Sequence, residues 1–452
     1  MNSRPLEEID RSRSKTAIYL VSTGLLVGAW LLPDFLFGGY SDVVHTFVLV
    51  SLYLLIGRAV LGSILSLSWP TVPSLPADVT LPTVSIVVPA YNEGPVLADT
   101  IDAVNRGDYP TDKLDLIICY EAESTDETAD IAEAAAAEYA HVRAIEHDDP
   151  EGAKARAVNY ALQFTTGDIV GQIDADHRLK PDAIRRAVSW FLHDEETWCV
   201  QGRCYGKNPA ESLVSLHATV ERHIAEMADL YGRERLGGFT VFGGGQVFFR
   251  ADVFEEVGLF DEEMLVEDID MSTRIHAAGK RLRVDPGIIS YEENPPTLRS
   301  WWSQRKRWAR GWMQVAKCYL TSLPTASTVS PRSKIDATFT FAYAIVPALL
   351  VFLLPLPGWY LVRGVPTLTY LTNDWVLWLL LPVAPVFVAY LIFLRDAMAG
   401  LDHHPLEYLA PFTLWLYFGL QALVFVTALL DEFLFEERRV FVTTSRSGES
   451  DL

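Results

Sequence analysis

The stretch DIVGQIDADHRLKP, residues 168–181, decides how the rest of the chain is interpreted. Its apolar beginning predicts a buried strand, and two carboxylates, Asp174 and Asp176, follow where that strand ends. Carboxylates this close repel each other unless a cation lies between them. Hard oxygen ligands at a strand end suit Mg²⁺ or Mn²⁺, usually completed by substrate phosphates. D-x-D pairs also occur in ordinary loops, but directly after this strand we interpret the pair as a metal site.

Strands and helices alternate on both sides of that stretch. VSIVVPA and LDLIICY read as buried strands, and STDETADIAEAAAAEYA reads as an amphipathic helix. The alternation predicts an α/β domain with a doubly wound parallel sheet, whose ligands bind beyond the carboxyl ends of the strands. The polar turns PAYNEG and EAESTDET follow two of these strands. An ordinary loop after a strand and a helix N-cap at Ser124 or Thr125 explain the same turns without any binding or catalytic role.

A second acidic cluster, VEDIDMS, contains Glu267, Asp268 and Asp270. Five glycines between residues 237 and 245 precede it and permit close approach of the backbone to a ligand, although a flexible loop is the simpler explanation. A carboxylate near a phosphate and metal site can serve as general base for a hydroxyl group. A helix N-terminus also favours acidic residues, so a structural role stays open.

The stretch SQRKRWARGWMQ, residues 303–314, gathers four cations and two tryptophans in a chain with a formal net charge of −21. A basic, aromatic helix at a membrane interface is one interpretation. The other is a site for an anion and a flat ring. The chain has nine lysines against 28 arginines and 58 acidic residues, which suggests a salt-rich, halophilic cytoplasm that screens the self-repulsion.

Several apolar runs are long enough to span a membrane, and they flank the α/β region: residues 16–33, 43–67, 337–362, 375–394 and 406–430. Cations precede the first run and none follows it before the second, so the positive-inside rule predicts a cytoplasmic N-terminus and central domain. We therefore expect an integral protein of the cell membrane, in contact with membrane lipid. Arg58 inside the second run should face protein or snorkel.

The order of PAYNE, S-T-D, GAKARAVNYAL, D-A-D, GGGQ, E-D and Q-R-K-R-W resembles the membrane-integrated family 2 glycosyltransferases. Within that family the chain looks most like the processive synthases of cellulose, chitin, hyaluronan and poly-N-acetylglucosamine, over residues 82–312. The resemblance implies a GT-A nucleotide-sugar domain inserted between transmembrane helices. It also implies an inverting hexosyltransferase that takes a sugar from a nucleotide sugar, expected to be a UDP-sugar, and extends and exports a polysaccharide.

Other functions stay open beside this one. One is a single addition to a polyprenyl phosphate or a lipid-linked oligosaccharide. Another, of a different class, is a catalytically inactive membrane sensor that binds nucleotides. We expect no nucleic-acid partner, and the sequence does not indicate an oligomeric state.

The resemblance also assigns roles to residues. Asp176 would bind the metal, with Asp174 on its nucleotide side, and Asp268 would be the catalytic base, with Glu267 beside it. The residues expected to bind substrate are Tyr91, Glu93, Glu121, Lys154, Gln304, Arg307 and Trp308. Arg307 would face the diphosphate and Trp308 the acceptor sugar. Glu121 and Ala122 replace the paired aspartates that are common at this position in the family. The resemblance therefore identifies the nucleobase less firmly than it identifies the transfer of a sugar. Val266 stands where threonine is usual.

These inferences divide the chain into five parts: two N-terminal transmembrane helices (1–70), the GT-A domain (79–297), interfacial helices with Q-x-x-R-W (298–334), C-terminal transmembrane or interfacial helices (335–434) and a polar tail (435–452). In the tail, Thr444 and Arg446 resemble part of the gating-loop pattern of cellulose synthases. That places the tail in the cytoplasm near the diphosphate. Such a topology requires one apolar run not to cross, and 406–430 is the candidate because polar residues and a proline interrupt it.

Overall fold

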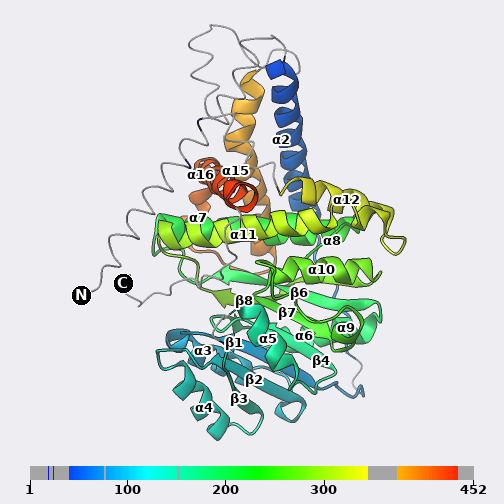
Figure 1. Ribbon diagram of the computed structural model, residues 1–452, viewed down its shortest axis with the longest axis vertical. Coiled ribbons are helices and arrows are strands. Elements are labelled where there is room, and N and C mark those ends of the chain that lie inside the picture. Colours follow the sequence, from blue (N-terminus) through cyan, green and yellow to red (C-terminus); the bar gives the residue numbers. More distant parts are fainter. Residues whose placement is uncertain are drawn as a thin grey trace, which may run out of the picture.

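The protein is described by a computed structural model that covers residues 19, 24, 40–75, 78–149, 153–344 and 374–435 (Figure 1). An eight-stranded sheet in the order β3-β2-β1-β4-β7-β6-β8-β5 forms its centre. The strands are β1 (Val84–Ala90), β2 (Leu114–Glu121), β3 (Val142–His147), β4 (Ile169–Ile173), β5 (Arg178–Leu179), β6 (Thr197–Gly206), β7 (Gln246–Arg250) and β8 (Arg281–Glu292).

The predicted α/β class is confirmed, but the sheet is not wholly parallel: β3, β2, β1 and β4 form one parallel set, and β6 and β8 form a separate parallel pair. Strand β7 lies antiparallel to both β4 and β6. It enters the sheet from the glycine-rich segment 243–245, at the edge where β4 ends, because the Asp174 N–H donates to the Gly245 carbonyl at 2.9 Å. A strand that starts at this edge must run back along β4. The sheet is therefore mixed.

Helices cover both faces of the sheet and extend above it. They are α3 (Gly94–Asn105), α4 (Thr128–Glu138), α5 (Lys154–Leu162), α6 (Ala183–His193), α7 (Leu213–Ile224), the π-helical η2 (Ala225–Tyr231), α8 (Gly232–Leu236), α9 (Asp252–Glu256), α10 (Glu267–Ala277), α11 (Leu298–Tyr319) and α12 (Pro331–Ala342). The remaining long helices are α2 (Tyr40–Leu65), α15 (Asp374–Met398) and α16 (Leu414–Phe433). Short 3-10 turns are η1 (Thr111–Lys113), η3 (Leu323–Thr325), η5 (Pro405–Tyr408) and η6 (Ala410–Phe412).

The predicted N-cap after β2 is wrong, because α4 begins only at Thr128. Ser124 and Thr125 instead hold the turn after β1. The Thr125 N–H donates to Asn92 Oδ1 at 2.8 Å, and the Asn92 N–H donates to Ser124 Oγ at 3.3 Å. Asn92 needs this support because its φ of 52° lies in the left-handed region. The S-T-D motif thus shapes the PAYNE turn.

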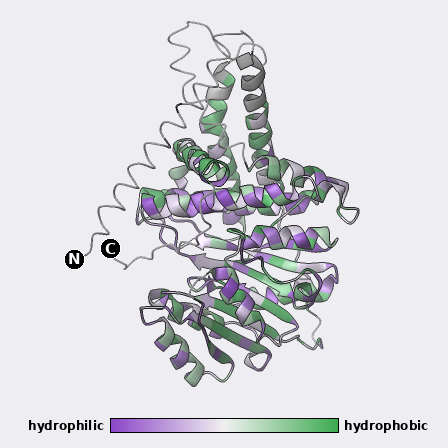
Figure 2. Ribbon diagram, viewed as in Figure 1, coloured by the Kyte–Doolittle hydropathy of each residue, from purple (hydrophilic) through white to green (hydrophobic). Residues whose placement is uncertain are grey.

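Two described helices, Leu379–Met398 and Leu414–Phe433, are long and apolar enough to cross a membrane. In Figure 1, α2 and α15 stand upright above the sheet, whereas α11 lies across their base. Figure 2 shows the upright helices and α16 as mainly hydrophobic where their residues are described. The apolar run 16–33 lies outside the described residues except for Tyr19 and Gly24, and so does 345–362. The run 406–430 is divided among η5, η6 and α16, and its failure to cross a membrane stays a prediction.

Helix α2 is fixed to the catalytic domain by charge and by close packing. Arg58 faces protein, as predicted: its Nη2 lies 3.3 Å from both Asp229 and Asp336 carboxylates. A β-carbon added at Gly62 would lie 1.8 Å from the Ala228 carbonyl oxygen of η2. The backbones of α2 and η2 are therefore in contact, which only glycine permits at this position.

Candidate active site

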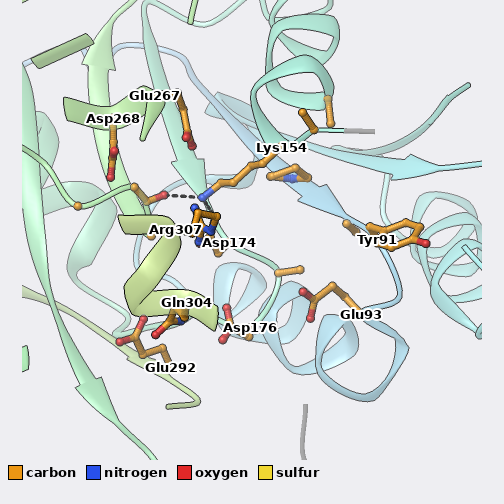
Figure 3. A pocket seen from close by; sticks show the side chains of 18 of the residues that line it. Tyr91, Glu93, Lys154, Asp174, Asp176, Glu267, Asp268, Glu292, Gln304 and Arg307 are labelled. Atoms are coloured by element: carbon orange, nitrogen blue, oxygen red, sulfur yellow. Dashed lines mark hydrogen bonds and ion pairs between the residues drawn. The ribbon is translucent and has the colours of Figure 1, made fainter. Parts of the chain in front are cut away.

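A cavity of about 520 Å³ opens at the carboxyl ends of β1, β2 and β4, where α5, α10 and α11 close over the sheet (Figure 3). The structure brings to its wall every predicted site residue that it describes: Tyr91, Glu93, Glu121, Lys154, Asp174, Asp176, Glu267, Asp268, Gln304, Arg307 and Trp308. The remaining two, Thr444 and Arg446, lie outside the described residues. Residues from six distant segments thus converge on one site.

Asp174 and Lys154 form an ion pair in the wall of the cavity. Lys154 is the first residue of α5, and its Nζ also donates to the Gly244 carbonyl at 3.0 Å. Burial alone would lower the pKa of Lys154, but Asp174 and Glu267 raise it overall, so the amine stays charged. A cation held here by one carboxylate is placed to contact a diphosphate.

Asp176 lies deeper and is 4% exposed. One of its oxygens accepts the Glu293 N–H at 3.4 Å. Asp174, Asp176 and the following His177 offer three ligand atoms within 4.8 Å of one another. The two carboxylates fit a divalent ion whose remaining positions are filled by substrate or water. Burial alone would lower the pKa of His177, but Cys204 and Glu292 raise it overall, so its ring lies beside this site as a hydrogen-bond donor to Glu292. Sequence reasoning missed His177, although its place directly after D-A-D was the available signal.

Asp268 stands at the start of α10, with Glu267 beside it. Burial and the Glu267 carboxylate raise the pKa of Asp268 to about 7, against the opposing effect of Lys154 and Arg307. The glycine-rich loop makes room for this side chain. Gly244 has a φ of 71°, and a β-carbon there would lie 2.9 Å from Asp268 Oδ2. A carboxylate with a pKa near neutrality is suited to accept a proton.

Helix α11 presents Gln304, Arg307 and Trp308 to the cavity, since residues three and four apart share one face of a helix. Arg307 Nη1 donates to the Leu265 carbonyl at 3.2 Å. The Trp308 ring is half-buried, and the Arg305 guanidinium carbon lies 4.3 Å from its centroid. An arginine and an aromatic face are therefore available together at this edge of the cavity.

The other cations of the SQRKRWARGWMQ stretch hold α11 in place. Arg305 pairs with Glu221 of α7 at 2.6 Å, and Arg310 pairs with Glu432 of α16 at 3.3 Å. Lys306 pairs with Asp431 of α16. One face of α11 thus lines the cavity, and these ion pairs tie the helix to α7 and α16, while its position at a membrane interface stays a prediction.

The cavity wall also contains residues that the sequence did not single out. Arg222 of α7 pairs with Glu292 at the end of β8, with Nη2 and Oε2 2.5 Å apart, and Glu292 Oε2 lies 3.1 Å from His177 Nε2. These residues belong to no local motif. Glu121, which the sequence did indicate, is nearly buried, and both of its oxygens lie 3.0 Å from His147 Nδ1.

A mixed sheet with D-x-D at the end of its central parallel strand and a basic helix across the opening defines a GT-A sugar transferase. The family model "Glycosyltransferase like family 2" matches residues 82–311, half of the chain. The chain belongs to this family and is a glycosyltransferase.

Relatives and a solved structure agree with this assignment. The chain is 29% identical over 242 residues to "Probable glycosyltransferase YdaM" of Bacillus subtilis, covering 53% of this chain and 57% of that protein. It is 28% identical over 243 residues to "Beta-monoglucosyldiacylglycerol synthase" of Synechocystis, covering 53% and 49%. The match thus spans about half the length of these relatives. A mannosyltransferase from Pyrobaculum calidifontis, solved with GDP-Man and Mn²⁺, has a TM-score of 0.60 at 20% identity, covering 87% of this chain and 99% of that one. This likeness concerns the fold.

Proposed function

We propose that the protein is an inverting transferase that moves a sugar from a nucleotide sugar to an acceptor hydroxyl at α11. The observation that carries the proposal is that Asp268, with a pKa of about 7, shares one cavity with Asp174 and Asp176. Asp268 takes the proton of the hydroxyl, whose oxygen attacks the anomeric carbon. The bond from that carbon to the phosphate oxygen breaks, and the nucleoside diphosphate leaves with the electron pair. One displacement inverts the anomeric configuration.

The chain's own groups support the leaving diphosphate. Arg307 offers planar donors, and Lys154 supplies a second positive charge beside it (Figure 3). Asp176 and Asp174 would hold Mg²⁺ or Mn²⁺, which neutralises charge on a diphosphate when bound. Tyr91 and Glu93 lie away from Asp268, on the side of β1, and are assigned to the nucleoside (Figure 3).

The charges around α11 favour a hydroxyl acceptor over a lipid phosphate. A phosphate is already ionised near neutral pH and needs no general base. It would instead need cations, but Arg222 and Arg305 are each paired with a carboxylate at 2.5 and 2.6 Å. Glu292 and Glu293 add negative charge on the same side. A phosphate acceptor would be repelled there.

Two kinds of hydroxyl acceptor remain. A growing polysaccharide, extended and exported across the membrane, is our first choice because Gln304, Arg307 and Trp308 share one face of α11 beside the cavity. A tryptophan face suits the C–H face of a sugar ring. A lipid hydroxyl is the second choice, supported by the Synechocystis relative, whose name gives a monoglucosyldiacylglycerol as its product. In both cases we place the catalytic domain in the cytoplasm.

The test uses the full chain purified in detergent with Mn²⁺ or Mg²⁺ and a panel of radiolabelled nucleotide sugars. Acceptors are oligosaccharides, diacylglycerol and a polyprenyl phosphate. We expect transfer to a hydroxyl acceptor with an inverted anomeric carbon, assigned by NMR. Transfer to the polyprenyl phosphate alone would overturn the acceptor class. Binding of nucleotide sugar without transfer or hydrolysis in any arm would favour the inactive sensor.

A further inference from the structure

A second polar cluster is buried where the catalytic domain meets α15. Arg203 of β6 donates to both oxygens of Asp396 in α15, each at 2.7 Å, and to His223 Nδ1 of α7 at 3.0 Å. His223 Nε2 lies 3.1 Å from Glu407 Oε2 in η5. His403 closes the ring, with Nδ1 3.0 Å from Glu407 and Nε2 3.0 Å from Asp396. We call these five residues the clasp.

The hydrogen bonds fix where the protons of the clasp lie. Arginine can only donate, so His223 Nδ1 is an acceptor and His223 Nε2 carries the proton that it donates to Glu407. Both nitrogens of His403 face carboxylates, so both must donate. His403 is therefore an imidazolium. Burial alone would lower the pKa of His403, but its hydrogen bonds to Asp396 and Glu407 raise it overall. Burial lowers the pKa of His223 to about 4.

A metal ion is the competing interpretation of the same atoms. His223 Nε2, His403 Nδ1 and Glu407 Oε2 lie within 4.8 Å of one another, which is within reach of one ion. Arg203 argues against it. A metal on His223 Nε2 would move the ring proton to Nδ1, where it would meet the Arg203 donor at 3.0 Å. A divalent ion would also add buried charge beside Arg203. Hydrogen bonds with the protons placed as above therefore satisfy the polar atoms of the clasp better than a metal ion does.

The clasp shares its backbone with the metal side of the active site. On β6, Arg203 enters the clasp, whereas the N–H of the next residue, Cys204, donates to Glu226 at 2.9 Å. On α7, His223 enters the clasp, whereas its neighbour Arg222 pairs with Glu226 at 3.4 Å and with Glu292 at 2.5 Å. Glu292 contacts His177, directly after Asp176. A shift of α7 would therefore displace both clusters.

We propose that His403 and Glu407 are positioning residues: the protonated clasp holds α7 in place, so that Arg222 keeps Glu292 and His177 aligned beside Asp176. Loss of one His403 proton turns a donor nitrogen into a lone pair that faces the carboxylate of Asp396 or Glu407, and this repulsion loosens α7. Transfer should then weaken as pH rises through the pKa of His403. The charged and titratable groups that face His403 or its partners are Asp396, Glu407, His223, Arg203, Arg395, Tyr205 and Tyr408.

The first test compares His403→Gln with His193→Gln in the protein chain described here. Glutamine is neutral and cannot donate to both carboxylates, whereas His193 is exposed at the end of α6 and lies outside the clasp. In His403→Gln we expect transfer at neutral pH to fall about tenfold and the high-pH decline of the wild type to vanish, on the scale of one buried charged hydrogen bond. His193→Gln should keep the wild-type rate and its high-pH decline. A His403→Gln variant with wild-type rate and the same decline would overturn the proposal.

A second measurement does not depend on activity. In ¹⁵N-histidine-labelled protein at neutral pH, the resonances that His403→Gln removes should show two protonated ring nitrogens. A neutral ring would overturn the proposal. So would one equivalent of a transition metal that purifies with the wild type and is lost in His403→Gln. If His403→Gln does not fold, Glu407→Gln takes its place, and an unchanged high-pH decline in that variant counts against the clasp.

Discussion

The cavity and the clasp are both rich in charge, yet their charges are arranged in opposite ways. Ten carboxylates and four cationic side chains line the cavity, so negative charge there exceeds what the chain itself neutralises. In the clasp, each carboxylate meets a donor and each imidazole nitrogen has a partner. The excess of negative charge in the cavity indicates a site where ligands supply positive charge. The closed set of hydrogen bonds in the clasp indicates a cluster that stabilises the fold. Substitutions in the cavity should therefore damage chemistry without much loss of stability, whereas substitutions in the clasp should lower stability together with the alignment of α7.

The largest effect on chemistry is expected from Asp268→Asn. An amide cannot take the acceptor proton, so transfer should fall about 10²–10⁴-fold, the contribution of a positioned general base. Nucleotide binding, measured by calorimetry with Mn²⁺ present, should change little because the charge of Asp268 is offset locally. Should nucleotide affinity fall as far as the rate, Asp268 is a binding residue and another group is the base.

The largest effect on stability is expected from Asp396→Asn. Removing this carboxylate leaves Arg203 and His403 without their buried partner, which costs about 3–5 kcal/mol of unfolding free energy. The control is Glu123→Gln on the cavity wall, which is exposed and should stay within about 0.5 kcal/mol. Unfolding midpoints in detergent measure both. Equal destabilisation in the two variants would remove the contrast between cavity and clasp.

Asp176→Asn should lose more than about nine tenths of metal-dependent transfer, a change above roughly 1.4 kcal/mol in the barrier. The neutral amide does not supply the charge that anchors a divalent cation. Titration of the rate with Mn²⁺ should show that much more metal is needed. A variant that keeps wild-type metal dependence would remove Asp176 from the metal site.

The smallest effect is expected when the pH is lowered slightly below neutrality and the transfer rate of the wild type is measured. Asp268 acts as a base only when ionised, and its pKa is about 7. The rate at limiting substrate should therefore rise with pH through neutrality and be lost as pH falls, by about tenfold per unit well below the pKa. Nucleotide binding, measured in parallel, should stay nearly level. A rate that is flat across this range would contradict the assignment of the base.

The parts of the site that were predictable are encoded locally. A buried strand that ends in Asp174 and Asp176 needs only the strand pattern and the repulsion of two carboxylates. Gln304, Arg307 and Trp308 needed only the helical period, which puts them on one face. The position of the site at the carboxyl ends of β1, β2 and β4 was also predictable, because ligands of parallel sheets bind beyond these strand ends.

The remainder depends on topology, which a local pattern does not contain. Arg203 lies in a segment that reads as an ordinary strand, and His403 precedes a run that reads as a membrane helix. Only the packing of α15 on α7 brings them together. Likewise, nothing in SQRKRWARGWMQ indicates that Lys306 pairs with Asp431. The antiparallel course of β7 follows from one hydrogen bond at the glycine loop, whose sequence suits many conformations.

The contact between α2 and η2 has a practical consequence for anyone who wishes to excise the catalytic domain. A cut near residue 70 would seem natural, because the sheet begins only at Val84. It would, however, strip Arg58 from Asp229 and Asp336 and expose the backbone that Gly62 covers at Ala228. A shortened protein of this kind would expose the apolar surface of η2 around Met227 and Ala228 and would be prone to associate in solution, so a fragment for study should retain α2.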